Sequence, residues 1–217
     1  MSDWLNNTFA GLDRTMMIAV NNLRDSAFKW LFDFISVLFA YLGKGGMAFL
    51  VAGVIFLLFR KTRKAGLAVL LAVGIGALFT NLILKPAVAR PRPYTTSEEF
   101  NAIWEQAGAH SEKEYSFPSG HTNVAMTAIT AMFLFFNKKW SWSLYFVVIV
   151  MGFSRMYLAV HYFTDVVGGV IVGGVSGVVA YFATLGLYKL IEKNKEKAFC
   201  KFWLEFDTLD AINKKKN

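Results

Sequence analysis

Residues 164–190 read TDVVGGVIVGGVSGVVAYFATLGLYKL, an apolar stretch whose only charged side chains are Asp165 and Lys189. About 20 helical residues cross the hydrocarbon core of a bilayer, so this stretch is long enough to span a membrane. Gly169, Gly173 and Gly177 recur at every fourth position. Small residues at this spacing let helix backbones approach closely. We therefore expect packing inside a helical bundle, with a dimer face as the alternative.

Other apolar runs of comparable character precede this stretch, at residues 27–43, 46–60, 65–84, 121–136 and 140–160. Together the runs predict an all-α, polytopic membrane bundle with six transmembrane spans. The composition agrees, because 55% of the residues are hydrophobic and the mean hydropathy is +0.42.

The chain divides into three predicted parts. Residues 1–26 form an N-terminal segment whose apolar positions have helical spacing, which favours an interfacial amphipathic helix or, equally, a helix packed on the bundle. Residues 27–190 form the six-span domain, which includes an outer loop at residues 85–120. Residues 191–217 form a basic tail.

Basic residues gather beside the apolar runs, at residues 60–64, 138–139 and 189–216. Short loops rich in Lys and Arg remain on the cytoplasmic side of a membrane. This pattern predicts two cytoplasmic termini in a plasma-membrane protein whose loop 85–120 faces outward. Because these segments carry much of the net charge of +8, we expect contact with anionic membrane lipids and no nucleic-acid partner. Cys200 is the single cysteine, which excludes an intrachain disulfide.

Three short blocks contain polar side chains that membrane topology does not explain. They are KPAVARPRP at 85–93, FPSGH at 117–121 and SRMYLAVHYFTD at 154–165. A helix rises about 1.5 Å per residue, so the first and third blocks lie at the outer ends of their predicted spans. The second block begins an inward span at the same depth. We expect the three blocks to meet there.

The residue types in these blocks suit a phosphate group. Lys85, Arg92 and Arg155 form a cationic cluster, and each arginine fork can bind two phosphate oxygens. Ser119 and Gly120 supply a hydroxyl and an unobstructed backbone N–H at a predicted helix start, which is itself an anion-binding position.

Histidines provide reactive groups beside this phosphate site. His161 and Asp165 are four residues apart and so lie on one helix face, where the carboxylate can orient the imidazole as a nucleophile or base. His121 then remains to protonate a leaving oxygen. A plain helix-capping pair is the structural alternative for His161 and Asp165. Arg90 is a secondary phosphate candidate, and Ser154 either contributes directly or only packs.

Taken together, the blocks closely resemble the three-part signature of the type 2 phosphatidic acid phosphatase family, the membrane-bound relatives of vanadium-dependent haloperoxidases. That signature is a lysine, six residues and Arg-Pro; then Pro-Ser-Gly-His; then Ser-Arg, five residues, His, three residues and Asp. Every fixed position has its counterpart within residues 85–165 of this chain.

The resemblance implies a metal-independent lipid phosphatase that needs no cofactor. His161 would attack phosphorus to form a phosphohistidine, Asp165 would support His161, and His121 would protonate the leaving group. The phosphate would be held by five groups, namely Lys85, Arg92, Ser119, Gly120 and Arg155.

Several substrates and functions remain open at this point. The resemblance favours undecaprenyl pyrophosphate as the substrate of this chain, because compact outward-facing bacterial members of the family often recycle that carrier. Phosphatidylglycerol phosphate and phosphatidic acid are the alternatives. A non-catalytic membrane scaffold and an anion transporter are rivals of another class. Acidic residues between positions 94 and 117 are expected to form a solvated loop.

Overall fold

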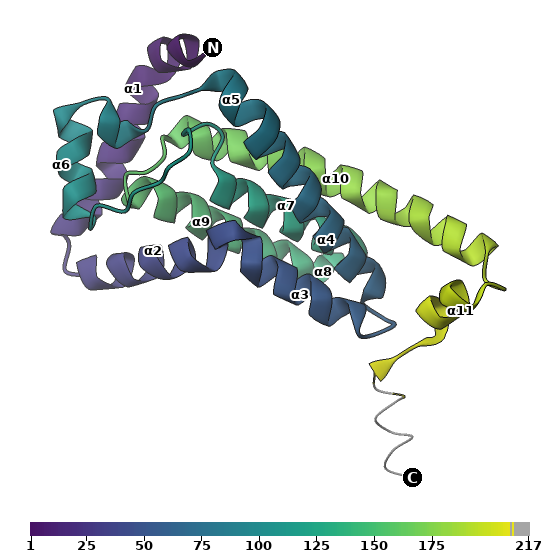
Figure 1. Cartoon of the computed structure of the whole chain (residues 1–217). Helices are drawn as coiled ribbons and strands as arrows, with labels where there is room; N and C mark the ends of the chain where they lie inside the picture. Colours follow the sequence, from purple (N-terminus) through teal and green to yellow (C-terminus); the bar gives the residue numbers. More distant parts are fainter. Residues whose placement is uncertain (209, 211–217) are drawn as a thin grey trace.

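The computed structural model describes residues 1–208 and residue 210, and over these residues it contains helices and no strand. The longer helices pack lengthwise, with shorter helices at both ends (Figure 1). In chain order they are α1 (Ser2–Asn21), α2 (Lys29–Gly43), α3 (Met47–Leu57), α4 (Arg63–Ala77), α5 (Lys85–Val88), α6 (Glu98–Gln106), α7 (Gly120–Phe135), α8 (Lys138–Ser141), α9 (Tyr145–Tyr157), α10 (Phe163–Lys193) and α11 (Ala198–Glu205). A π-helical turn, Leu78–Leu84, joins α4 to α5.

Close packing of α10 against α7 forms the centre of the bundle. A Cβ atom added to Gly169 would lie 2.7 Å from the Ser119 carbonyl oxygen, and one added to Gly173 would lie 2.7 Å from the Asn123 carbonyl oxygen. Both distances are too short for any side chain, so the glycines let the two helix backbones touch. The prediction that the glycine repeat packs inside the bundle is confirmed.

The first two predicted spans form one continuous stretch. Residues Lys29–Leu57 are helical throughout apart from a bend at Gly45 and Gly46, whose φ angles are +60° and +71°. Figure 1 shows α3 continuing in the general direction of α2, after which α4 returns alongside α3. The prediction of two separate spans at residues 27–43 and 46–60 is therefore not confirmed, because a pair of glycines can bend a helix as well as close a loop.

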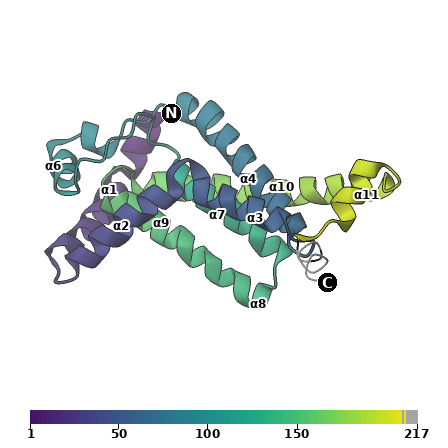
Figure 2. The same ribbon diagram turned by 60° about the horizontal axis from the view of Figure 1, so that its bottom comes forward.

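Because α2 and α3 run on in one direction, the first helix and the last described helix lie near opposite ends of the bundle. Asn6 and Asp13 of α1 accept hydrogen bonds from Arg90, near the end of the bundle that carries His161. At the opposite end, Arg63 donates to carbonyl oxygens next to α11. We call these the His161 end and the α11 end (Figure 1; Figure 2).

The described helices α1 and α11 lie at opposite ends of the bundle, whereas six crossings of a membrane would bring the chain back to its starting side. The side of a membrane on which each terminus lies stays a prediction. Residues 1–26 form α1 and a short 3-10 turn packed on the bundle, with Leu5 and Met17 buried. Part of the predicted basic tail, residues 209 and 211–217, lies outside the described residues.

Three helical stretches of the described chain are long and apolar enough to cross a membrane. They are Lys29–Leu57, Arg63–Thr95 and Phe163–Lys193. The runs predicted at 121–136 and 140–160 correspond to the shorter α7 and α9. That α7 and α9 cross a membrane stays a prediction.

Candidate functional site

The three sequence blocks meet at the His161 end, as their helical spacing predicts. Lys85 begins α5, Arg92 lies in the extended chain after α5, Gly120 and His121 begin α7, and His161 lies in the link between α9 and α10. All five line one cavity of about 230 Å³.

The contacts of His161 define which ring nitrogen can react. Its Nε2 atom lies 3.1 Å from Nη1 of Arg92. A guanidinium can only donate, so Nε2 accepts and its lone pair lies on this edge of the ring. On the opposite edge, Nδ1 lies 3.5 Å from Oδ2 of Asp165, where an Nδ1–H can interact with the carboxylate.

The surroundings of His161 also favour its neutral form. The side chain is 2% exposed. Burial, followed by the positive charges of Arg92, Arg155 and Lys85, holds the pKa of His161 well below its ordinary value. The imidazole therefore stays unprotonated at neutral pH, as a nucleophile requires.

Asp165 is fully buried and held from several directions. Its Oδ2 atom accepts from the Ser116 hydroxyl at 2.5 Å and from the Tyr162 backbone N–H at 2.9 Å. Its Oδ1 atom accepts from Nη1 of Arg90 at 2.6 Å. A carboxylate with this many donors keeps a fixed position and can in turn orient His161.

Arg90 differs from its predicted role as a secondary phosphate ligand. It is 1% exposed and bridges two carboxylates, with Nη1 on Asp165 and Nη2 on Asp13 at 2.7 Å. Asp13 also accepts from the backbone N–H and the hydroxyl of Thr164, at 2.8 Å each. Arg90 therefore ties α1 to the carboxylate behind His161.

Sequence reasoning missed Asp13 and Ser116 as members of this site. Asp13 lies eight residues after Leu5 and four before Met17, so it shares the buried face of α1 with both. A charged residue on an apolar helix face is the feature from which Asp13 could have been identified. Ser116 directly precedes the FPSGH block, and nothing else in the sequence distinguishes it.

The predicted phosphate-binding cations have acidic partners from the loop before α7. Glu114 forms an ion pair with the buried Lys85, and Oε1 of Glu112 lies 3.5 Å from Nη1 of Arg155. Arg92 donates from Nε to the Glu114 carbonyl oxygen at 2.9 Å. The acidic loop is therefore solvated only in part, because Glu114 is 59% exposed and yet contacts a buried cation, as Glu112 does. These carboxylates lie against the cations that a phosphate would need.

Arg155 keeps one unused donor. Its side chain is 2% exposed, and its Nε atom has no hydrogen-bond partner among the described residues. An unpaired buried N–H is costly, so an anionic ligand that accepted a hydrogen bond from Nε would satisfy this donor.

The Pro-Ser-Gly-His block contributes mainly backbone and one imidazole. The buried Ser119 hydroxyl lies 3.0 Å from the Thr122 hydroxyl and caps α7, and the Ser119 N–H donates to the Asp165 carbonyl oxygen at 2.9 Å. A Cβ atom on Gly120 would lie 3.7 Å from Nζ of Lys85, so the start of α7 lies beside this cation.

One ring nitrogen of His121 contacts the main chain. Its Nε2 atom lies 3.1 Å from the Ala40 carbonyl oxygen, which can only accept, so Nε2 carries a proton there. Nδ1 is then the nitrogen that can take up or release a proton.

Ser154 donates to the Ser36 carbonyl oxygen at 2.7 Å, and this hydrogen bond joins α9 to α2.

Comparison with known proteins gives three findings. The model of the PAP2 superfamily matches residues 65–187, which include all three blocks. A lipid A 4'-phosphatase of Porphyromonas gingivalis is 29% identical over 78% of this chain and 72% of that protein. The undecaprenyl-diphosphatase BcrC of Bacillus subtilis is 35% identical over 48% of this chain, and the match spans half of that protein's length.

Solved structures share the fold as well. The crystal structure of a PAP2 type phosphatidylglycerolphosphate phosphatase from Bacillus subtilis superposes with a TM-score of 0.59 and 26% identity. The superposition covers 85% of this chain and 88% of that structure.

Proposed function

Because this chain belongs to the PAP2 superfamily, we propose that it is an integral membrane lipid phosphatase with His161 as its nucleophile. One observation carries the proposal. The lone pair of His161 Nε2 faces the cavity beside Arg92, while Asp165 holds the opposite edge of the ring. An oriented neutral imidazole beside cations can attack a bound phosphate.

The reaction follows from these positions. Nε2 of His161 forms a bond to phosphorus as the bond from phosphorus to the leaving oxygen breaks. His121, which enters this step protonated on both ring nitrogens, donates its Nδ1 proton to that oxygen. Water then attacks the phosphohistidine and gives a proton to His121. The phosphorus–nitrogen bond breaks, its electron pair returns to Nε2, and inorganic phosphate leaves. Asp165 stabilises the positive charge that develops on the imidazole.

Five groups would hold the phosphate during these steps. Lys85, Arg92 and Arg155 would neutralise its charge, and the Gly120 N–H at the start of α7 would add a backbone donor. Ser119 would act by capping α7, since its hydroxyl is engaged with Thr122.

Among lipid substrates we favour a diphosphate such as undecaprenyl pyrophosphate. Lys44 lines the same cavity as His121 and His161. It lies next to Gly43, where an added Cβ atom would be 2.6 Å from Cδ2 of His121, the proposed proton donor. When a diphosphate is cleaved the leaving group is itself an anionic phosphate, which a neighbouring lysine stabilises. Phosphatidylglycerol phosphate and phosphatidic acid, the alternatives, release a neutral alcohol.

The same proposal gives the protein an orientation. Basic residues cluster at the α11 end, which supports a cytoplasmic position for that end. The His161 end would then face the outer side of the plasma membrane, together with α1.

The test is phosphate release by the detergent-purified chain in EDTA, with undecaprenyl pyrophosphate, phosphatidylglycerol phosphate and phosphatidic acid as substrates. We expect release from at least one lipid and none with His161→Ala. Loss of release in EDTA, or release that survives in His161→Ala, would contradict the mechanism. No release from any lipid by the folded protein would favour a scaffold or an anion transporter.

Lys44→Gln tests the choice of substrate. We expect kcat/KM for undecaprenyl pyrophosphate to fall about tenfold, the scale of one hydrogen bond to a charged group, with little change for phosphatidylglycerol phosphate. Lys113→Gln is the matched control, because Lys113 is exposed on the neighbouring loop and does not line this cavity. Equal losses for both substrates would remove the argument for a diphosphate.

A further inference from the structure

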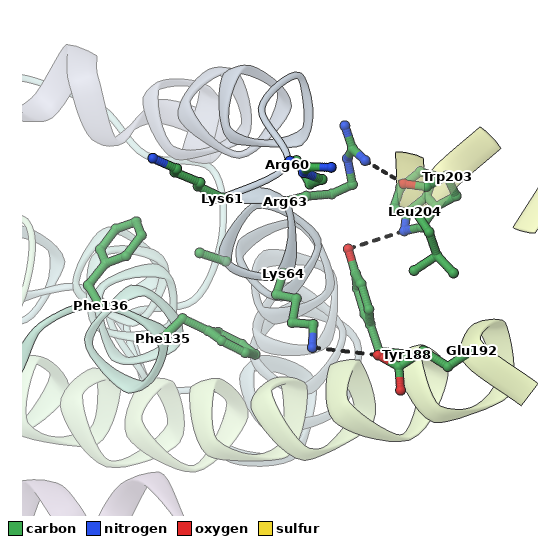
Figure 3. A pocket seen from close by; sticks show the side chains of 11 residues that line it. Arg60, Lys61, Arg63, Lys64, Phe135, Phe136, Tyr188, Glu192, Trp203 and Leu204 are labelled. Atoms are coloured by element: carbon green, nitrogen blue, oxygen red, sulfur yellow. Dashed lines mark hydrogen bonds and ion pairs between the residues drawn. The ribbon is translucent and has the colours of Figure 1, made fainter. Parts of the chain in front are cut away.

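A second cavity, of about 370 Å³, lies at the α11 end of the bundle. It is bounded by the start of α4, the end of α10 and α11, and Figure 3 shows the side chains around it. This cavity, which we call the α11-end pocket, is separated from His161 by the length of α10 and shares no lining residue with the cavity there.

Four cations line the α11-end pocket: Arg60, Lys61, Arg63 and Lys64. Among the described residues that line the pocket, Glu192 is the one acidic residue, and its Oε1 atom lies 3.9 Å from Nζ of Lys64, at the limit of an ion pair. Beside the pocket, the Asp207 carboxylate accepts from the Arg60 backbone N–H at 2.9 Å. Four cations beside these two carboxylates leave the pocket with excess positive charge.

Arg63 has a different task from its neighbours and gives the pocket its shape. It is 4% exposed and donates from Nε to the Leu57 carbonyl oxygen at 2.8 Å. Its two terminal nitrogens donate to the carbonyl oxygens of Trp203 and Phe206. These bonds hold α11 against the start of α4, so the pocket is a built feature of the fold.

Aromatic and apolar groups adjoin the cations. Nε1 of Trp203 donates to the Tyr188 hydroxyl at 3.1 Å, and Nζ of Lys64 lies 4.8 Å from the Tyr188 ring centroid (Figure 3). Nearby on α10, Leu187 and Leu190 are 40% and 59% exposed. Trp, Tyr and basic residues beside exposed apolar side chains are typical of the zone where lipid headgroups meet the hydrocarbon core.

We propose that the α11-end pocket binds the phosphate headgroup of an anionic phospholipid, with its acyl chains along the apolar surface of α10. Basic pockets between membrane helices bind such headgroups by charge. General attraction of loop lysines to a lipid surface would not require a pocket, nor an α11 that Arg63 fastens in place. The proposal does not depend on the reaction at His161.

The test uses the full-length chain in neutral detergent and follows its thermal unfolding with added phosphatidylglycerol. We expect the lipid to raise Tm by about 3 °C or more, because a ligand that binds only the folded state stabilises it. Phosphatidylcholine, and soluble glycerol 3-phosphate at the same concentration, should not. If glycerol 3-phosphate gives the same shift, the pocket binds a soluble phosphate and the lipid proposal is overturned.

Two double variants separate the pocket from general surface charge. Arg60→Gln with Lys64→Gln should abolish the phosphatidylglycerol shift. Lys138→Gln with Lys139→Gln removes the same charge from α8, which does not line the pocket, and it should leave the shift intact. Loss of the shift in both double variants, or its retention in both, would overturn the proposal.

Discussion

His161 is held by different groups on its two nitrogen-bearing edges. Arg92 lies at Nε2, while Asp165 lies at Nδ1 with Ser116 and Arg90 behind it. The first edge faces the cavity and the second faces the protein interior. At the scale of single residues, groups on the first edge should therefore affect substrate binding and groups on the second edge should affect the chemical step.

Arg90→Lys tests the inner edge. A lysine keeps the charge but lacks the fork that reaches Asp165 and Asp13 together. We expect kcat to fall about ten- to a hundredfold, the scale at which loss of an outer positioning partner acts, with KM little changed. Steady-state kinetics on the preferred lipid measure both constants.

Arg14→Lys is the matched control for Arg90→Lys, since Arg14 is exposed on α1 and pairs only with Glu99 at the surface. A rise in KM at constant kcat would instead make Arg90 a phosphate ligand. Thermal unfolding of each variant shows whether the fold survives the change.

The pH dependence of kcat/KM tests the outer edge. Burial and Arg92 both lower the pKa of His161, so replacing Arg92 with Gln removes a positive charge and should raise that pKa. More of the nucleophile is then protonated at a given acid pH, and the acidic limb of kcat/KM should move to higher pH. Arg92→Lys retains the charge and should leave the limb in place. An unmoved limb in Arg92→Gln would assign it to another group.

At the scale of elements, the loop between α6 and α7 competes with substrate for the cations. Glu114 pairs with Lys85 and Glu112 approaches Arg155, so an incoming phosphate must displace both carboxylates. The loop is thus positioned as a movable cover of the site.

Glu114→Gln removes one competitor. Since the Glu114 side chain is 59% exposed, its ion pair is weak, and we expect KM to fall by no more than about fivefold at unchanged kcat. Glu105→Gln, an exposed change on α6, should leave KM unaltered. If KM rose in Glu114→Gln, the carboxylate would be assisting substrate binding.

The contact between α10 and α7 depends on glycine at defined positions. A Cβ atom on Gly173 would overlap the Asn123 carbonyl oxygen, while one on Gly186 of the same helix would meet nothing within 4 Å. Gly173→Ala should destabilise the protein by about 1–3 kcal/mol, as overpacking does, and Gly186→Ala should not. Thermal unfolding in detergent compares the two. If both variants were equally stable, the contact between α10 and α7 would not depend on glycine at position 173.

At the scale of the whole molecule, the fold has two chemically distinct ends. The His161 end combines buried charges with a cavity, and the α11 end combines exposed cations with aromatic side chains. The bundle thus separates the proposed reaction from the proposed lipid contact by the length of its helices.

Labelling of cysteines in intact cells tests how these ends lie in a membrane. Cys200 of α11 is the single native cysteine, and a membrane-impermeant maleimide should reach it only after permeabilisation. With Cys200→Ser as background, Ser2→Cys and Glu99→Cys should both be labelled from outside, because α1 and α6 lie at the His161 end. If Cys200 were labelled in intact cells and Glu99→Cys were protected, the orientation would be the opposite of the one proposed. Protection of Ser2→Cys alone would restore the prediction of a cytoplasmic N-terminus.

The amino-acid sequence alone was enough to predict a helical, apolar chain in which Lys85, Arg92, His121 and His161 converge. Helical rise and the spacing of apolar residues are local properties, so the depth of each block could be read from the distance along its own run. The glycine repeat of α10 likewise predicted its packing, because backbone contact depends on side-chain size alone.

Only the tertiary structure decided how distant parts of the chain share one site. Asp13 reaches Arg90 from α1, Ser116 reaches Asp165 from the loop before α7, and Glu114 reaches Lys85. Such contacts depend on how whole helices pack, which no short motif records. The tertiary structure likewise decided the bend at Gly45 and Gly46. The same two glycines allow either a bend or a reversal, and the packing of α2 on α9 and of α3 on α4 selects the bend.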